Sequence, residues 1–212
     1  RRVRAHRRDA GRTSFQWLGI RDEPWTPQLA FELLPETNGP RVEVFRGSVV
    51  VSPHAGVDHQ SIEFNLASLL KPPARRAGCF LYHEINVVSG DDLFIPDLVI
   101  LRESGAGRTS VAIETVMLLG EIVSAGNRRK DVIDRPKEYA AAGVPFFLRV
   151  DFRNRVPAIT LFALEDGEYQ PLVAAAAGTM FVMKEPFAVE FDRLSCWTSR
   201  RRAVGGLPGS VG

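Results

Sequence analysis

Short apolar runs alternate with turn-forming residues along most of the chain, a pattern typical of β-strands joined by tight turns. The hairpin signals are clearest at Arg46-Gly47 and Asp166-Gly167, because each dipeptide separates two apolar runs. Pro96 interrupts the start of another run, so that strand is expected to be broken there. The runs expected to be strands span residues 42–45, 49–51, 80–88, 94–101, 116–123, 146–150, 159–164, 169–173 and 187–191.

Two segments show the apolar spacing of helices instead. We expect the first to begin near Asp58, which can act as an N-cap, and to end at Lys71-Pro72-Pro73, because proline cannot donate a backbone hydrogen bond. The second is expected over 128–142, kinked or begun at Pro136 with Asp134 as its cap. The apolar positions that share one face of the first helix are Ile62, Leu66, Leu69 and Leu70.

The order of these elements predicts an α/β (mixed α+β) fold, with a central mixed β-sheet flanked by helices and with extra β-hairpins. Neither a GxxxxGK[ST] nor a GxGxxG motif occurs, which argues against a nucleotide-binding fold. We expect a basic, irregular extension over 1–40 with a short helix near 27–34, a folded domain over 41–195, and a flexible tail over 196–212.

The charge of the chain is unevenly distributed. The formal net charge is +2, but residues 1–12 carry +5 and Arg200–Arg202 add +3, which leaves −6 for residues 13–199. A surface that binds duplex DNA without sequence preference is normally basic, so this distribution argues against strong non-specific binding by the folded body. Basic ends of this kind are typical of solvated tails.

Neither the cysteines nor the hydropathy indicates an extracellular or membrane protein. Cys79 and Cys196 have no metal-binding spacing and form no disulfide framework, so a reducing, cytoplasmic location is expected. No apolar run approaches the roughly 20 residues that a membrane span requires. The arginine-rich start lacks the apolar segment of a secretory signal.

Two carboxylates stand in or beside apolar strands. Asp97 precedes a run of four apolar residues, and Glu121 lies inside the most apolar stretch of the chain, 116–123. Burying an ionised carboxylate costs several kcal/mol unless a cation or hydrogen-bond donors compensate it. Mg²⁺ or Mn²⁺ would compensate both acids at once, because these ions prefer carboxylate oxygens. On spacing alone, the alternative that each acid is solvated at a strand end or paired with an arginine stays open.

Several segments, in the same order, resemble Uma2 domains, a restriction-endonuclease-like family. Uma2 domains are similar to the PD-(D/E)xK nuclease superfamily, in which an Asp and a Glu bind Mg²⁺ and a Lys helps to position the attacking water. The resemblance therefore implies a restriction-endonuclease-like core with Asp97 and Glu121 as the metal ligands. The matching segments are 42–53 (VEVFRGSVVVSP), 58–60 (DHQ), 96–99 (PDLV), 121–124 (EIVS) and 139–145 (YAAAGVP).

The lysine of that superfamily has no direct counterpart here. Val123 stands two positions after Glu121, and Arg135 occupies the position from which Uma2-like sequences commonly supply a lysine, four before the tyrosine. Lys130 and Lys137 flank it, and on a helix Lys137 would point about 200° away from Arg135. The resemblance thus implies Arg135 and Lys137 as catalytic candidates, although an arginine stabilises phosphate charge better than it transfers a proton.

Three further side chains are secondary candidates. Glu43 matches an acid in the first strand of the family and is either a third metal ligand or a charge at a sheet edge. His59 stands just inside a helix N-terminus, where capping or packing is its commoner role and substrate contact is the alternative. Asp131 is expected to be a solvated helix acid.

Together these observations predict a Mg²⁺- or Mn²⁺-dependent endonuclease that hydrolyses phosphodiester bonds of DNA. DNA is the expected partner, a homodimer is compatible with the sequence, and no membrane is expected. The alternative is a catalytically inactive nuclease-fold module that binds nucleic acid or a protein partner. Arg135 at the lysine position and the acidic body favour this alternative.

Overall fold

A six-stranded mixed sheet lies at the centre of the protein, whose computed structural model describes residues 23–34, 41–52, 54–123, 135–152, 157–176 and 179–197. Its strand order is β11-β10-β9-β8-β6-β3. Strands β8 and β9 run parallel, and the other neighbours are antiparallel. The bounds are β3 Phe80–His83, β6 Leu98–Leu101, β8 Val116–Val123, β9 Phe146–Asp151, β10 Ala158–Glu165 and β11 Glu168–Ala175.

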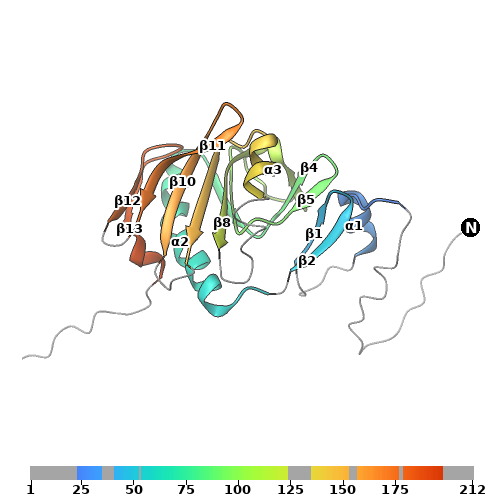
Figure 1. The fold of residues 1–212 in the computed structure, drawn as a ribbon, viewed down its shortest axis with the longest axis horizontal. Helices are drawn as coiled ribbons and strands as arrows, with labels where there is room; N and C mark the ends of the chain where they lie inside the picture. Colours follow the sequence, from blue (N-terminus) through green and yellow to red (C-terminus); the bar gives the residue numbers. More distant parts are fainter. Residues whose placement is uncertain are drawn as a thin grey trace, which may run out of the picture.

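A second sheet has the order β2-β1-β5-β4-β7, and a separate hairpin pairs β12 with β13. Figure 1 shows β1, β2 and α1 at one end of the molecule and the β12–β13 hairpin at the other, with the six-stranded sheet between them. These strands are β1 Arg41–Phe45, β2 Ser48–Ser52, β4 Asn86–Ser89, β5 Asp92–Phe94, β7 Ser110–Ala112, β12 Met180–Met183 and β13 Val189–Asp192.

Helices and the smaller sheet cover the two faces of the central sheet. The described helices are α1 Pro27–Leu33, α2 Val57–Arg76 and α3 Arg135–Ala141, with short 3₁₀ turns at Ile113–Thr115 and Arg193–Cys196. Helix α2 and the β12–β13 hairpin bury their apolar side chains on one face, and α3 packs with the smaller sheet on the other. The central sheet is therefore buried on both sides, which accounts for the continuous apolar sequence of β8.

The packing of strand β8 fixes the position of Glu121. Leu118 and Ile122 belong to the core on the α2 side, and Leu119 belongs to the core on the α3 side. A Cβ at Gly120 would lie 3.0 Å from the Cβ of Leu98, so glycine lets β8 and β6 approach closely at this point. The next residue of β8 is Glu121, which is thus held in a rigid, closely packed part of the sheet.

The predicted fold class is confirmed: the structure is a mixed α+β fold with a central mixed sheet, flanking helices and extra hairpins. Both predicted hairpins form, β1–β2 at Arg46-Gly47 and β10–β11 at Asp166-Gly167. The continuous strand expected at 116–123 coincides with β8. The short helix expected near 27–34 is present as α1, and Trp25 and Ala30 pack there against Val44 of β1 and Leu93 of β5.

Three predictions about element boundaries were wrong. Helix α2 continues through Pro72-Pro73 to Arg76 and begins at Val57, so Asp58 lies in its first turn and Gly56 takes the N-cap position. The two prolines cost backbone hydrogen bonds only near the helix end, and Pro73 and Ala74 are buried there. The expected strand 80–88 divides into β3 and β4, which belong to different sheets. The break expected at Pro96 is present, since β5 ends at Phe94 and β6 begins at Leu98.

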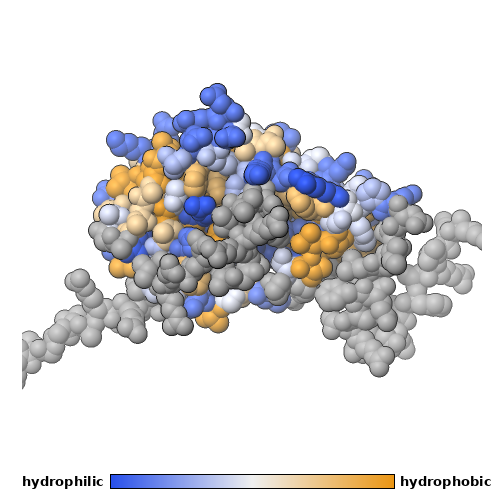
Figure 2. Space-filling view, viewed as in Figure 1, coloured by the Kyte–Doolittle hydropathy of each residue, from blue (hydrophilic) through white to orange (hydrophobic). Residues whose placement is uncertain are grey.

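The sequence did not predict β12, whereas β13 overlaps the strand expected at 187–191. The expected helical segment 128–134, with Lys130, Asp131 and Asp134, lies outside the described residues, as do 1–22 and 198–212. None of the helices in the described part of the chain is long and apolar enough to cross a membrane. Figure 2 shows apolar side chains gathered over β10–β13, at the left of the view, and a more hydrophilic surface around α3.

Candidate active site

Asp97 occupies the short link between β5 and β6, directly after Pro96, and is only 2% exposed. Its Oδ2 atom accepts a hydrogen bond of 2.7 Å from the backbone N–H of Ile122 on β8. Its Oδ1 atom accepts one of 2.7 Å from Nη1 of Arg41 on β1. Burial would raise the pKa of Asp97, but His59, Arg41 and the Ile122 N–H hold it below its ordinary value, so the group is a carboxylate near neutral pH.

The strand register brings Glu121 to the same end of the sheet. Leu98 pairs with Gly120 across β6 and β8, so the residues next to this pair, Asp97 and Glu121, lie opposite one another where β6 begins. Burial would lower the pKa of Arg41, but the charges of Asp97, Glu84 and Glu121 together raise it. Asp97 and Glu121, the two predicted metal ligands, therefore both stabilise the charged form of Arg41.

Glu121 lies in a buried network with residues of α3 and β1. The hydroxyl of Tyr139 donates a hydrogen bond of 2.6 Å to its Oε1, and Nη1 of Arg135 lies 3.4 Å from the same atom. Nη2 of Arg135 forms a short ion pair with Glu43, whose Oε1 also accepts the N–H of Ile95 at 2.8 Å. All four of these side chains are at most 5% exposed.

The groups of this network fix one another's protonation states. Burial opposes the charged form of Arg135, but Tyr139, Glu121 and Glu43 keep its pKa well above the ordinary value. Burial likewise raises the pKa of the Tyr139 hydroxyl far above its ordinary value, so it remains a hydrogen-bond donor. Arg135 thus serves as a fixed cation between two buried acids. Lys137, the other catalytic candidate, is exposed on α3 and takes no part in this network.

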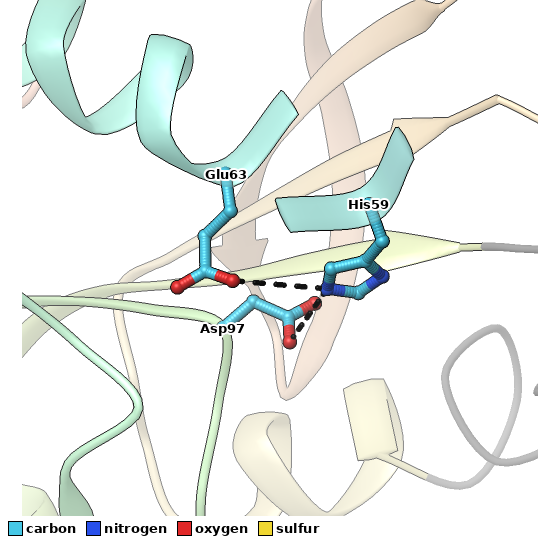
Figure 3. Close-up of side chains that lie close together, drawn as sticks. All are labelled: His59, Glu63 and Asp97. Atoms are coloured by element: carbon cyan, nitrogen blue, oxygen red, sulfur yellow. Dashed lines mark ion pairs between the residues drawn. The ribbon is translucent and has the colours of Figure 1, made fainter. Parts of the chain in front are cut away.

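A second group of side chains meets Asp97 from helix α2. His59 and Glu63 lie one turn apart on α2 and both face the Asp97 carboxylate (Figure 3). The Nε2 atom of His59 lies 3.2 Å from Oδ1 of Asp97 and 3.9 Å from Oε2 of Glu63. One nitrogen or oxygen atom from each of the three side chains lies within 4.8 Å of the others.

Glu63 is a site residue that the sequence analysis missed. It is 6% exposed, and its Oε1 lies 3.1 Å from Nδ1 of His83 on β3. Burial, reinforced by the Glu84 and Asp97 carboxylates, raises its pKa to about 7. A signal was present in the sequence, because Glu63 follows Ile62 on the apolar side of the helix and stands four residues after His59.

The model of one protein family matches this chain over residues 29–195, well over half of its 212 residues. That family is Uma2, described as "Putative restriction endonuclease". The chain belongs to the Uma2 family. This confirms the resemblance inferred from the sequence, and the matched region includes every residue of both acidic groups. No curated protein matches the chain.

A solved structure shares the fold of this Uma2 chain. It is described as a putative nuclease belonging to DUF820 from Anabaena variabilis, with a TM-score of 0.58 and 18% sequence identity. The alignment covers 70% of this chain and 84% of the other. At this level of identity the likeness supports the fold alone.

The Uma2 site thus has two halves that meet at Asp97. On one side, Glu43 and Glu121 share Arg135, and Tyr139 donates to Glu121; on the other, His59 and Glu63 lie on α2. Carboxylate oxygens on the first side suit a hard divalent ion, and the imidazole on the second widens the choice of metal. Such a set can bind cations and, through them, phosphate oxygens.

Proposed function

We propose that this Uma2 protein is an endonuclease that hydrolyses phosphodiester bonds of DNA with the help of Mg²⁺ or Mn²⁺. The observation that carries the proposal is the placement of two buried acids, Asp97 and Glu121, at the same end of the neighbouring strands β6 and β8. Burying two carboxylates is costly, and proteins of this size retain such acids mainly where they pair with cations or bind metal.

The donor atoms fit the proposed ion. Asp97, Glu121 and the secondary candidate Glu43 offer only oxygen ligands, which Mg²⁺ and Mn²⁺ prefer. Bound there, such an ion would supply Lewis-acid chemistry, lowering the pKa of a water molecule and neutralising phosphate charge. The Ile122 N–H and Arg41 hold the Asp97 carboxylate in one orientation, which removes part of the entropic cost of ligation.

The cationic side chains would act on the phosphate. Arg135 is fixed by Glu43 and Tyr139 beside Glu121, where its guanidinium can stabilise the charge that develops on a phosphate oxygen. It stays protonated throughout and therefore cannot serve as the general base. Lys137 is exposed on the same helix, and in this proposal it would contact the DNA backbone rather than the buried acids.

Plasmid cleavage tests this proposal. Wild-type protein is expected to convert supercoiled DNA to nicked and linear forms when Mg²⁺ or Mn²⁺ is present and not when EDTA is present. Asp97→Asn and Glu121→Gln are expected to lose this activity while keeping their circular dichroism spectra. Glu165→Gln, on the exposed end of β10, is the matched control and is expected to cleave normally. Equal activity in all four proteins would contradict the assignment.

A catalytically inactive nuclease-fold module is the second candidate function. One observation favours it: Arg135 already neutralises Glu121 and Glu43 and is a poor proton carrier. Such a module would bind nucleic acid or a protein partner without cleaving it. Binding of a labelled DNA duplex without cleavage in any divalent metal would support this candidate over the first.

We further propose a cytoplasmic setting, since both cysteines are buried free thiols. We also propose a homodimer, because a two-fold symmetric dimer matches the two-fold symmetry of palindromic DNA sites. Sedimentation at several protein concentrations, with and without DNA, tests the dimer.

A further inference from the structure

We propose that His59, Glu63 and Asp97 form a binding site for a divalent transition-metal ion, separate from the Glu121 network. Two of the donor atoms come from successive turns on one face of α2, and the third comes from the link that precedes β6 (Figure 3). This site does not depend on nuclease activity, although it shares Asp97 with the proposed function.

The geometry of the three donors supports a bound ion. Their ligand atoms lie within 4.8 Å of one another, while an ion with metal–ligand distances of about 2.0–2.2 Å brings its ligands to roughly 3–4 Å from one another. Small rotations of the Glu63 and His59 side chains would close this difference. The backbone of all three residues is held in place, since α2 packs on the sheet and Asp97 accepts the N–H of Ile122.

The imidazole of His59 gives an independent indication. His59 is 9% exposed, and its Nε2 atom is fully enclosed, yet it makes no hydrogen bond within the described part of the chain. Its contacts are ion-pair distances of 3.2 Å to Oδ1 of Asp97 and 3.9 Å to Oε2 of Glu63, neither of which is a hydrogen bond. A buried polar atom whose hydrogen bond is not made costs free energy, and a metal ion between the three side chains would satisfy this nitrogen directly.

The surrounding residues support ligation by Glu63. Nδ1 of His83 lies 3.1 Å from Oε1 of Glu63, which leaves Oε2 directed toward His59. A neighbouring imidazole at this distance helps to orient a ligating carboxylate. Arg41 binds Asp97 and Glu84 rather than Glu63, so the only cations that ion-pair with Glu63 among the described residues are histidines.

The donor set selects the class of ion. Two carboxylates and one imidazole nitrogen suit Mn²⁺, Co²⁺ or Zn²⁺, whereas Mg²⁺ and Ca²⁺ prefer sites made only of oxygen. We therefore expect the site to bind Co²⁺ and Zn²⁺ at least tenfold more tightly than Mg²⁺.

Metal titration of the full chain tests the proposal without any activity measurement. Metal-free protein is titrated with Co²⁺ and followed by visible absorption, and with Zn²⁺ and Mg²⁺ by calorimetry. The variants His59→Gln and Glu63→Gln are expected to weaken Co²⁺ binding at least tenfold. His54→Gln, at an exposed histidine outside the cluster, is the matched control and is expected to bind Co²⁺ as the wild type does. Glu121→Gln shows which group of acids holds the tight ion, and it is expected to keep the tight Co²⁺ site.

Three outcomes would overturn the site: no Co²⁺ binding by the wild type, unchanged binding in both His59→Gln and Glu63→Gln, or loss of binding only in Glu121→Gln. Thermal melts of each variant separate loss of a ligand from loss of the fold. Cleavage assays run in parallel keep this proposal distinct from the nuclease proposal, because tight Co²⁺ binding without cleavage supports the site and contradicts only the enzyme.

Discussion

Replacing Arg135 by methionine should destabilise the protein more than an ordinary helix substitution. The guanidinium contacts Glu43, Glu121 and the Tyr139 hydroxyl, and the arginine is only 5% exposed. Methionine has a similar length and can fill the space beside Phe94, over whose ring the guanidinium carbon lies at 5.8 Å. The substitution therefore removes the charge and its hydrogen bonds while largely keeping the packing.

The size of the effect follows from the acids that remain. Removing one partner of a buried ion pair typically costs about 3–5 kcal/mol, because an uncompensated charge is left in the interior. Here two carboxylates lose the same cation, so we expect the upper part of that range. Domains of this kind have a total stability of about 5–15 kcal/mol, so the variant would lose a large share of it.

Urea unfolding, followed by circular dichroism, measures this loss. At pH 7.5 the unfolding midpoint of Arg135→Met should fall with an unchanged slope. The deficit should shrink toward pH 5, because the uncompensated carboxyls would have a raised pKa in the folded protein. A raised pKa means that stability is present at low pH and is lost as the pH rises.

A compensating variant shows whether charge is the cause. Adding Glu43→Gln and Glu121→Gln to Arg135→Met should recover most of the lost stability, because the buried charges are then gone. A deficit below about 1 kcal/mol in the single variant, set against the expected 3–5 kcal/mol, would refute the reasoning. So would a triple variant that is no more stable than the single one.

Two further predictions follow from the same buried groups. Tyr139→Phe removes the hydroxyl that donates to Glu121 and should cost about 1–3 kcal/mol in thermal unfolding, with the fold retained; a melting temperature equal to that of the wild type would contradict this. In metal-free protein, Glu63 has a pKa raised from its ordinary value of 4.5 to about 7, so its contribution to stability is present below pH 4.5 and is lost as the pH rises to about 7. Glu63→Gln should therefore be more stable than the wild type at pH 8 in EDTA, by on the order of 1–2 kcal/mol after allowance for solvent screening; urea unfolding at pH 5 and pH 8 checks this, and an equal gain at both values would argue against titration of Glu63.

The sequence predicted those parts of the fold whose signals are local. The unbroken apolar run of β8 and the Asp166-Gly167 turn were recognisable because strand burial and positive-φ turns impose characteristic residues. The division of 80–88 between two sheets was not recognisable. It depends on Glu84, which adopts φ 49° without being glycine, and on strand partners far away in the chain.

The same distinction applies to the site. Asp97 and Glu121 were conspicuous because an acid beside four apolar residues needs an explanation, and the structure places both in the interior. Glu63 was overlooked because a glutamate in an amphipathic helix is ordinarily solvated. Its burial comes from the position of α2 relative to β3 and β6, which no local pattern reveals.

The distribution of fixed positive charge suggests which half of the site takes up an ion first. Arg135 remains protonated between Glu43 and Glu121, and Arg41 does the same between Asp97 and Glu84. Glu63, by contrast, forms its ion pairs among the described residues with His59 and His83 and with no guanidinium. A divalent ion arriving at the His59 side therefore competes with a guanidinium only for Asp97, which Arg41 pairs, and not for Glu63. An ion arriving at Glu121 and Glu43 must compete with Arg135 for both acids. Occupancy at α2 should precede occupancy at β8, and cleavage, if it depends on the second ion, should require a higher metal concentration than Co²⁺ binding does.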